Sequence, residues 1–228
     1  MADLATWQQA LSISFNDPSL LEQALVHRSY VNENPTMTSN ERLEFLGDAI
    51  LGLIIAERLY HRLPHLSEGE MTKLRSILVR RDSLARIATD IGLGHYLYLG
   101  KGEEASGGRH KPTNLAAALE AVIAAIYLDQ GLVATRNLVL GLFDVRMEET
   151  ISGGAWVDHK SQLQELTQAK WQTTPVYHLI EAVGPAHDTT FTVEVRIGDT
   201  VLGRGAGKSK KRAETEAARS ALRQAFTQ

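Results

Sequence analysis

The stretch that decides the fold is NERLEFLGD, residues 40–48, which continues as AILGLIIAERL. On a helix, the carboxylates of Glu41, Glu44 and Asp48 fall on one stripe roughly 60° wide, while nearly all other positions are apolar. A helix that is apolar almost all round is normally buried, and clustered carboxylates there repel one another and lose hydration. The stretch therefore predicts a buried helix whose carboxylates need a neutralising partner.

Two kinds of partner would neutralise this stripe. One is ordinary helix chemistry, with a favourable charge in the first turn and ion pairs to Arg42 or Arg58. Both arginines, however, lie off the stripe, at roughly 100° and 260° from Glu41. The other partner is a divalent cation, and ligation by oxygen alone suits Mg²⁺ or Mn²⁺ rather than zinc or a di-iron centre. We favour the cation and keep ion pairing as the alternative.

A second helical run carries one isolated carboxylate. In NLAAALEAVIAAIYLD, residues 114–129, Glu120 is the only ionisable residue before Tyr127 and Asp129. A lone carboxylate in apolar surroundings is costly to bury. Either Glu120 bonds to an arginine or a backbone amide, or the two helices are neighbours and Glu120 joins the first three carboxylates around a metal.

Composition limits the classes of protein that fit. Of the 228 residues, 43% are hydrophobic and 22% charged, which is ordinary for a soluble globular protein. There is no cysteine, so disulfides and thiolate metal sites are excluded. The chain does not open with a signal-peptide pattern, and its longest apolar run is interrupted by Glu120. We expect a cytoplasmic protein with no membrane contact and no small-molecule cofactor.

The sequence changes character near ISGGAW, residues 151–156. Before it, apolar residues recur at three- and four-residue intervals, which predicts an all-α domain over residues 1–151. Residues 152–157 are expected to form a linker. Residues 158–228 predict a small α+β domain in the order α-β-β-β-α. This tail has 10 Lys and Arg against 8 Asp and Glu, so it is locally basic in a chain of net charge −3.

These motifs together resemble bacterial ribonuclease III. NERLEFLGD and LEAVIAAIYLD occur in the family's order with QALVHRSY, EGEMTKLRSILVRRDSLA and the SGG loop at 106–108. The tail, with LQE, GPAHD and GKSKKRAETEAA, resembles a double-stranded-RNA-binding domain. The resemblance implies a homodimeric, Mg²⁺-dependent endoribonuclease that cuts double-stranded RNA to 5′-phosphate and 3′-hydroxyl ends with short 3′ overhangs. It also implies roles in rRNA and mRNA processing and decay, with Mn²⁺ as a substitute ion.

The resemblance assigns roles to the acidic residues. Asp48 and Glu120 become the catalytic residues and, with Glu44, the metal ligands. Glu41 and Glu68 become supporting carboxylates.

The resemblance also places Phe45 at the dimer interface, although an ordinary core phenylalanine is an equally good interpretation of this residue from sequence alone.

One position departs from the family pattern. Three residues before Glu120 the family usually has an aspartate, and this chain has Ala117. Residues i and i+3 share a helix face, so one carboxylate is missing beside the expected metal. The enzyme then uses fewer side chains and more water, or its cleavage is weakened, or the aspartate was removed by engineering. The second case leaves an alternative function, a double-stranded-RNA-binding protein of the same fold with weakened or lost cleavage.

The resemblance assigns RNA binding to the tail. Modules of this kind read the shape of A-form RNA across about 16 base pairs. Gln164 and Glu165 would contact one minor groove and His187, in the loop after Gly184, the next. Lys208, Lys210 and Lys211 would contact phosphates between them, and the last two lie near a helix N-terminus that favours anions.

Overall fold

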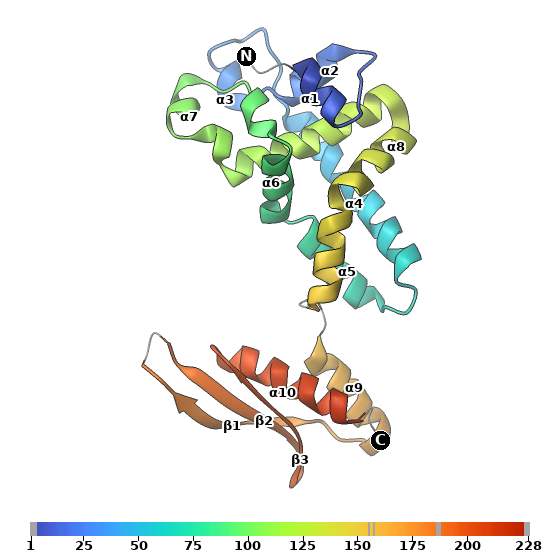
Figure 1. Cartoon of the computed structure of the whole chain (residues 1–228), viewed down its shortest axis with the longest axis vertical. Coiled ribbons are helices and arrows are strands. Elements are labelled where there is room, and N and C mark those ends of the chain that lie inside the picture. Colours follow the sequence, from blue (N-terminus) through green and yellow to red (C-terminus); the bar gives the residue numbers. More distant parts are fainter. Residues whose placement is uncertain (1–3, 155, 157, 186–187, 226–228) are drawn as a thin grey trace. The chain divides into compact units, whose positions relative to one another are not determined.

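A computed structural model describes residues 4–154, 156, 158–185 and 188–225. The chain divides into two compact units, Met1–Trp156 and Val157–Gln228. The first is mostly helical, and the second combines two helices with three strands (Figure 1). This confirms the predicted fold class of an all-α domain followed by a small α-β-β-β-α domain.

The elements of the first unit are α1 (Leu4–Ala10), α2 (Pro18–Ala24), α3 (Arg28–Val31), α4 (Glu41–Arg62), α5 (Glu68–Leu78), α6 (Arg81–Asp90), η1 (Leu93–Tyr96), α7 (Lys101–Ala105), η2 (Gly108–His110) and α8 (Pro112–Gly153). The second unit contains α9 (His159–Trp171), β1 (Val176–Val183), β2 (Thr190–Ile197), β3 (Thr200–Gly207) and α10 (Lys210–Ala225).

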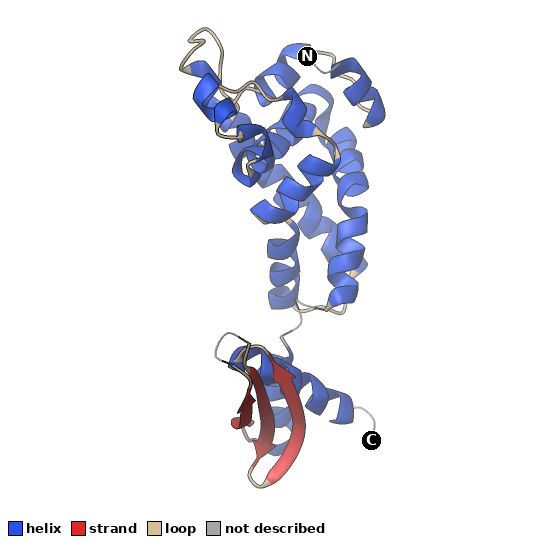
Figure 2. Ribbon diagram, turned by 60° about the vertical axis from the view of Figure 1, so that its left-hand side comes forward, coloured by secondary structure: helices blue, strands red, loops and turns tan. Residues whose placement is uncertain are grey.

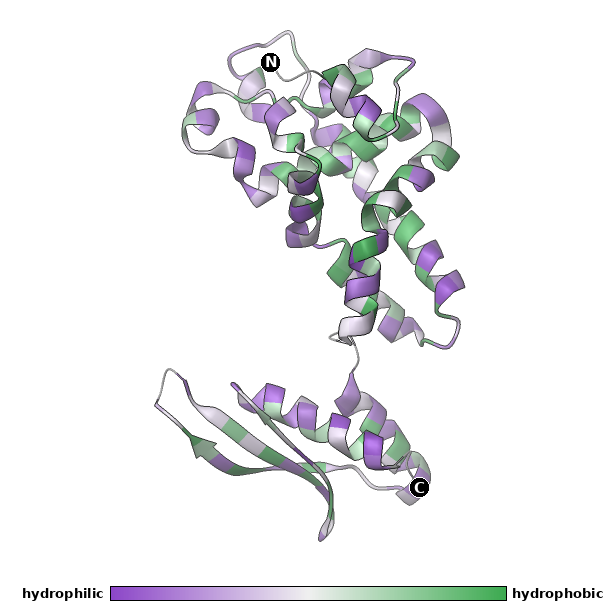
Figure 3. Ribbon diagram, viewed as in Figure 1, coloured by the Kyte–Doolittle hydropathy of each residue, from purple (hydrophilic) through white to green (hydrophobic). Residues whose placement is uncertain are grey.

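The core of the first unit is built where α4 crosses α8. Gly47 of α4 is buried against the backbone of α8, because a Cβ at this position would overlap the carbonyl oxygen of Glu120. Hydrophobic residues concentrate along both helices (Figure 3). Gly131, with φ 79° and ψ −177°, interrupts the helical backbone of α8 and divides it into two segments. The crossing therefore fixes Glu120 beside the carboxylate stripe of α4.

Several expected helices are shorter than their apolar periodicity predicts. The run from residue 68 to 93 is broken at Arg80, whose extended backbone separates α5 from α6. The run from 20 to 30 is broken at Val26, which forms a parallel bridge with Tyr98. Residues 100–113, which are rich in glycine and charge, contain α7 and the 3₁₀ helix η2. In each case tertiary contacts or short-range turns, which periodicity does not detect, set the boundaries.

The helix α8 is long and apolar enough to cross a membrane by length and composition alone. Half of its most apolar stretch is buried within the protein.

The second unit contains a three-stranded antiparallel sheet (Figure 2), whose strands lie in the order β1-β2-β3. Its core joins Val193 and Val195 of β2 to Leu163 of α9 and to the alanines of α10. Both helices therefore pack against the same face of the sheet. This leaves the other sheet face, and one side of each helix, exposed.

β3 approaches α10 through a row of glycines. A Cβ at Gly203, Gly205 or Gly207 would meet the backbone of α10 near Ala221, Ala217 and Ala213 respectively. Alternate residues of a strand face one side of the sheet, and alanines four apart face one side of a helix. Small residues on both elements thus allow the helix to lie directly on the sheet.

Candidate active site and RNA-binding surface

The candidate active site lies at the crossing of α4 and α8. Glu44 and Asp48 lie one helical turn apart on α4, and Gly47 between them contacts the backbone of Glu120. Glu44 and Glu120 are half-buried, whereas Glu41 and Asp48 are exposed. The structure therefore brings together Glu44, Asp48 and Glu120, which the sequence analysis placed in one site.

Glu120 carries the strongest electrostatic signature of the group. Burial and the nearby charges of Asp48 and Glu44 raise the pKa of its carboxyl to about 7. No hydrogen bond or ion pair joins its carboxylate to another residue of the described chain. Within the described chain, no cationic side chain therefore compensates the negative charge at Glu120.

The other carboxylates differ in their surroundings. The pKa of Glu44 is raised by burial and by Glu41 and Asp48, and Arg28 opposes this shift. Glu41 accepts a hydrogen bond of 2.8 Å from the hydroxyl of Ser39, just before α4. Arg28 and Ser39 were missed by the sequence analysis, because neither forms a motif with the carboxylate stripe.

The ion pairs to Arg42 and Arg58 do not form at this stripe, although Glu41 and Glu44 do lie in the favourable first turn of α4. Arg58 pairs with Asp144 of α8 at 3.5 Å, and within the described chain Arg42 forms no ion pair. Burial without a cation is unfavourable for carboxylates, so a divalent ion is the partner that fits this set of oxygen donors.

The described residues nevertheless contain no set of three His, Cys, Asp or Glu side chains already drawn together around a metal position. The oxygen donors, the burial of Glu120 and its raised pKa fit a hard divalent cation, with water completing the ligand set.

Glu68 lies outside this cluster. It begins α5, accepts a 2.9 Å hydrogen bond from the Thr72 hydroxyl and lines an apolar hollow with Leu53 and Tyr60. It is not among the groups that shift the pKa of Glu120. The structure therefore does not bring Glu68 to the other four carboxylates.

Phe45 is displayed on the surface, although it lies on the same helix as the acidic residues. Its side chain is 81% exposed and, with Leu20, Leu46 and Leu128, lines a hollow of about 640 Å³. Of the two interpretations of Phe45, the ordinary core residue is wrong.

The second unit displays most of the predicted RNA-binding residues. Gln164 and Glu165 line a hollow of about 520 Å³ on α9. Lys210 and Lys211 are exposed in the first turn of α10, and neither side chain has a partner among the described residues. Lys208 instead donates a 2.7 Å hydrogen bond to Asp188, in the loop between β1 and β2. His187 lies outside the described residues.

In comparisons with known proteins, each of the two units matches a family model. The ribonuclease-III-like family model matches residues 17–144, and the double-stranded RNA binding motif matches residues 159–225. Ribonuclease 3 of Dehalococcoides mccartyi strain 195 is 55% identical over 98% of this chain and 95% of its own. The chain belongs to the ribonuclease III family.

Other relatives agree with this assignment. Ribonuclease 3 of Borreliella afzelii is 47% identical over 97% of this chain and 91% of its own. The nuclease domain of Campylobacter jejuni ribonuclease III has a TM-score of 0.59 and 39% identity, over 63% of this chain and 97% of that domain. That structure is described for flexibility in the region involved in dimer formation. The chain is thus a ribonuclease III-type endoribonuclease of double-stranded RNA, from a family that generally uses a divalent metal.

One informative residue of this site was missed at the sequence level. Within residues 41–62, Gly47 is followed by no other glycine until Gly52. An isolated glycine in a helix usually has a packing reason. That signal points to the close approach of α8, but it does not name Glu120 as the neighbour.

Proposed function

We propose that the protein is a homodimeric, Mg²⁺-dependent endoribonuclease of the cytoplasm. It hydrolyses double-stranded RNA to 5′-phosphate and 3′-hydroxyl ends with short 3′ overhangs, in rRNA and mRNA processing and decay, and Mn²⁺ substitutes for Mg²⁺. The observation that carries the proposal is the half-buried Glu120, whose pKa is raised by burial and by Asp48 and Glu44 with no protein cation beside it.

The chemistry requires negative charge to be stabilised on the phosphate and on the leaving 3′-oxygen. When bound, Mg²⁺ lowers the pKa of a water, orients it and stabilises the leaving oxygen. Asp48 and Glu120 would hold this ion directly, with Glu44 as a further ligand. Glu41, oriented by Ser39, would support the site from the start of α4. Gly47 positions Glu120 by allowing the two helices to touch.

The dimer would form through the surface around Phe45. An exposed aromatic next to an apolar hollow suits a two-fold interface, in which Phe45 of each protomer enters the hollow of its partner. The exposed Leu53 and Tyr60 continue this apolar surface along α4.

In the second unit, Gln164, Glu165 and His187 would read the minor grooves of RNA, while Lys208, Lys210 and Lys211 contact phosphates. The free ammonium groups at the start of α10 support this role, because anions are also favoured by the helix N-terminus.

A second candidate function is duplex binding with weakened or lost cleavage. Ala117 supports it, because it lies one helical turn from Glu120 and supplies no ligand. Incubation of the protein with a long RNA duplex, with and without millimolar Mg²⁺, separates the candidates. Mg²⁺-dependent fragments support the endonuclease, and binding without fragments supports the second candidate.

The assignment of Glu120 is tested by Glu120→Gln, which removes its charge at nearly constant volume. We expect cleavage of duplex RNA to fall by more than about 100-fold, because even indirect partners of a metal ligand cost 10–100-fold. Duplex affinity should remain close to the parental value. Glu22→Gln, an exposed carboxyl of α2, is the matched control. Parental cleavage rates in Glu120→Gln would show that the metal site is elsewhere.

A further inference from the structure

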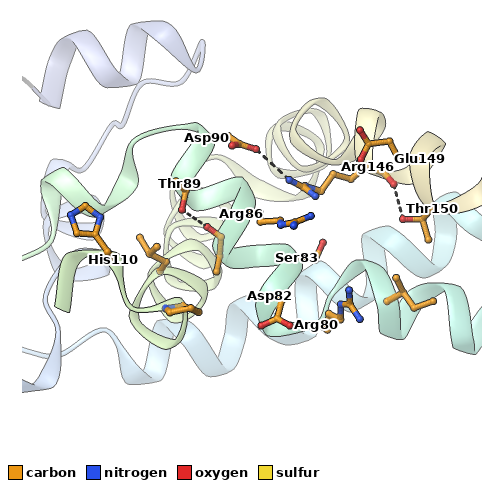
Figure 4. A pocket seen from close by; sticks show the side chains of 14 residues that line it. Arg80, Asp82, Ser83, Arg86, Thr89, Asp90, His110, Arg146, Glu149 and Thr150 are labelled. Carbon is orange, nitrogen blue, oxygen red and sulfur yellow. Dashed lines mark hydrogen bonds and ion pairs between the residues drawn. The ribbon is translucent and has the colours of Figure 1, made fainter. Parts of the chain in front are cut away.

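A separate polar cavity lies in the nuclease unit, and none of the four carboxylates lines it. It has a volume of about 600 Å³ and lies between α6 and the C-terminal part of α8, next to Leu115 near the start of α8 (Figure 4). Small-molecule sites commonly have volumes of about 300–1,000 Å³. The cavity is therefore large enough for a ligand of nucleotide size.

Two arginines of this cavity have no carboxylate partner. Arg80 and Arg86 are exposed and line it, and neither guanidinium forms an ion pair or hydrogen bond with a described residue. By contrast, Arg58, Arg62 and Arg136 of the same unit each pair with a carboxylate across the α4–α8 contact. The cavity therefore contains two guanidinium groups that form no ion pair within the described chain.

Two further side chains in the cavity, Arg146 and Ser83, have hydrogen-bond donors without a good acceptor in the described chain. Arg146 lies 3.5 Å from Asp90, a long distance for an ion pair, and its buried Nε has no hydrogen-bond partner. Ser83 is only 9% exposed, and its hydroxyl forms no hydrogen bond within the described chain. Figure 4 shows Arg86, Arg146 and Ser83 directed toward the same part of the cavity. The unused donors come from both α6 and α8.

The cavity also has three carboxylates, which restrict its ligand. Asp90 is engaged by Arg146, and Asp82 lies in the first turn of α6, where a negative charge is favoured. Glu149 completes the set. A phosphate suits the arginines of this lining, because guanidinium groups bind it through paired, charge-assisted hydrogen bonds.

We propose that this cavity is a phosphate-binding site in which Arg80, Arg86, Arg146 and Ser83 hold the oxygens. The phosphate comes from the backbone of bound RNA or from a free polyphosphate such as that of a nucleotide. The assignment to a phosphate of the RNA backbone rests on the proposed function, whereas the assignment to a free polyphosphate does not.

The free source is tested by calorimetric titration of the full-length protein with pyrophosphate in the absence of divalent ions. We expect Arg86→Gln and Arg80→Gln each to weaken binding by about tenfold, the loss of one hydrogen bond to a charged group. Arg81→Gln is the matched control, because Arg81 is an exposed arginine of the same helix that does not line the cavity. Unchanged melting temperatures without ligand would show that the variants fold.

The RNA source is tested by duplex affinity in the Glu120→Gln background, which holds the RNA uncut. A fall in affinity with Arg86→Gln but not with Arg81→Gln, and no binding of pyrophosphate, assigns the cavity to a backbone phosphate. No effect of Arg80→Gln or Arg86→Gln in either experiment overturns the proposal. If the Glu120→Gln protein binds no duplex at all, the proposed function fails, and the pyrophosphate titration alone decides the cavity.

Discussion

Ala117 is the position in the proposed metal site where the resemblance to the family leads us to expect an aspartate. It is half-buried and lies one turn before Glu120 on α8. An aspartate there would face the same cation as Glu120 and would increase the attraction for Mg²⁺. The parental protein should therefore need more Mg²⁺, or favour Mn²⁺.

We expect Ala117→Asp to lower the Mg²⁺ concentration for half-maximal cleavage, by up to about tenfold. A Mg²⁺ titration of cleavage by both proteins measures this change. Thr113→Asp, which adds the same charge at an exposed position of α8, is the control. Identical half-saturation would mean that position 117 does not face the metal or that water already fills the gap. A crowded, unpaired aspartate would instead lower stability.

Glu194 is a buried carboxylate in the sheet of the second unit. It is 1% exposed on β2, and it pairs with Arg196 and, at 3.0 Å, with Arg204 of β3. Burial alone would raise the pKa of its carboxyl, but the hydrogen bonds from the two arginines outweigh burial and lower it. A lowered pKa in the folded state means that the charged form stabilises the fold.

The stabilisation by Glu194 should therefore be present above its ordinary pKa of 4.5 and be lost as the pH falls through the lowered folded-state value. Thermal melting of the parent and of Glu194→Gln at pH 7 and at pH 3 measures this dependence. We expect the variant to melt lower at pH 7 and the difference to shrink at pH 3. Glu181→Gln, an exposed carboxyl on β1, should show no such trend. A difference of equal size at both pH values would exclude the ionic contribution.

At the scale of elements, β3 can pack on α10 because its glycines carry no side chains at the contact. A Cβ at Gly205 would overlap the backbone nitrogen of Ala217, so neither element can yield by rotating a side chain. The sequence TVLGRGAG, residues 200–207, does not indicate this contact, because alternating glycines have no apolar periodicity to show which partner they face.

We expect Gly205→Ala to destabilise the second unit by about 2 kcal/mol, a typical cost of overpacking. For a domain of this size that lowers the melting temperature by roughly 10 °C. Ala206→Val adds more atoms to the neighbouring, exposed position of β3 and should have little effect. An unchanged melting temperature for Gly205→Ala would show that α10 can move away from the sheet without cost.

At the scale of the whole molecule, cutting and RNA binding are assigned to different units. Each unit has its own hydrophobic core, so the nuclease unit should survive without the other. The surface around Phe45 also lies wholly within the first unit.

We expect a protein lacking residues 158–228 to remain a folded, helical dimer that cuts duplex RNA only at low salt. The deletion removes Lys208, Lys210 and Lys211. Each lost phosphate contact makes the negative slope of log affinity against log salt less steep by about 0.9. Filter binding across a salt series measures the slope, and sedimentation velocity measures the dimer. An unchanged slope would contradict the role of the tail, and a monomer would contradict the interface at Phe45.

The sequence by itself determined the class of the fold and the identity of the acidic residues. Apolar periodicity and the rarity of charge within it depend on local spacing, which is written in the chain, so the α4 stripe and Glu120 could be found without coordinates. Which helices touch was decided only by the tertiary structure, because packing depends on residues far apart in sequence. Gly47 against Glu120, Phe45 turned to solvent and the unpaired arginines beside α6 all arise from such contacts. Burial and neighbouring charge, rather than residue type, then set the electrostatics of the site.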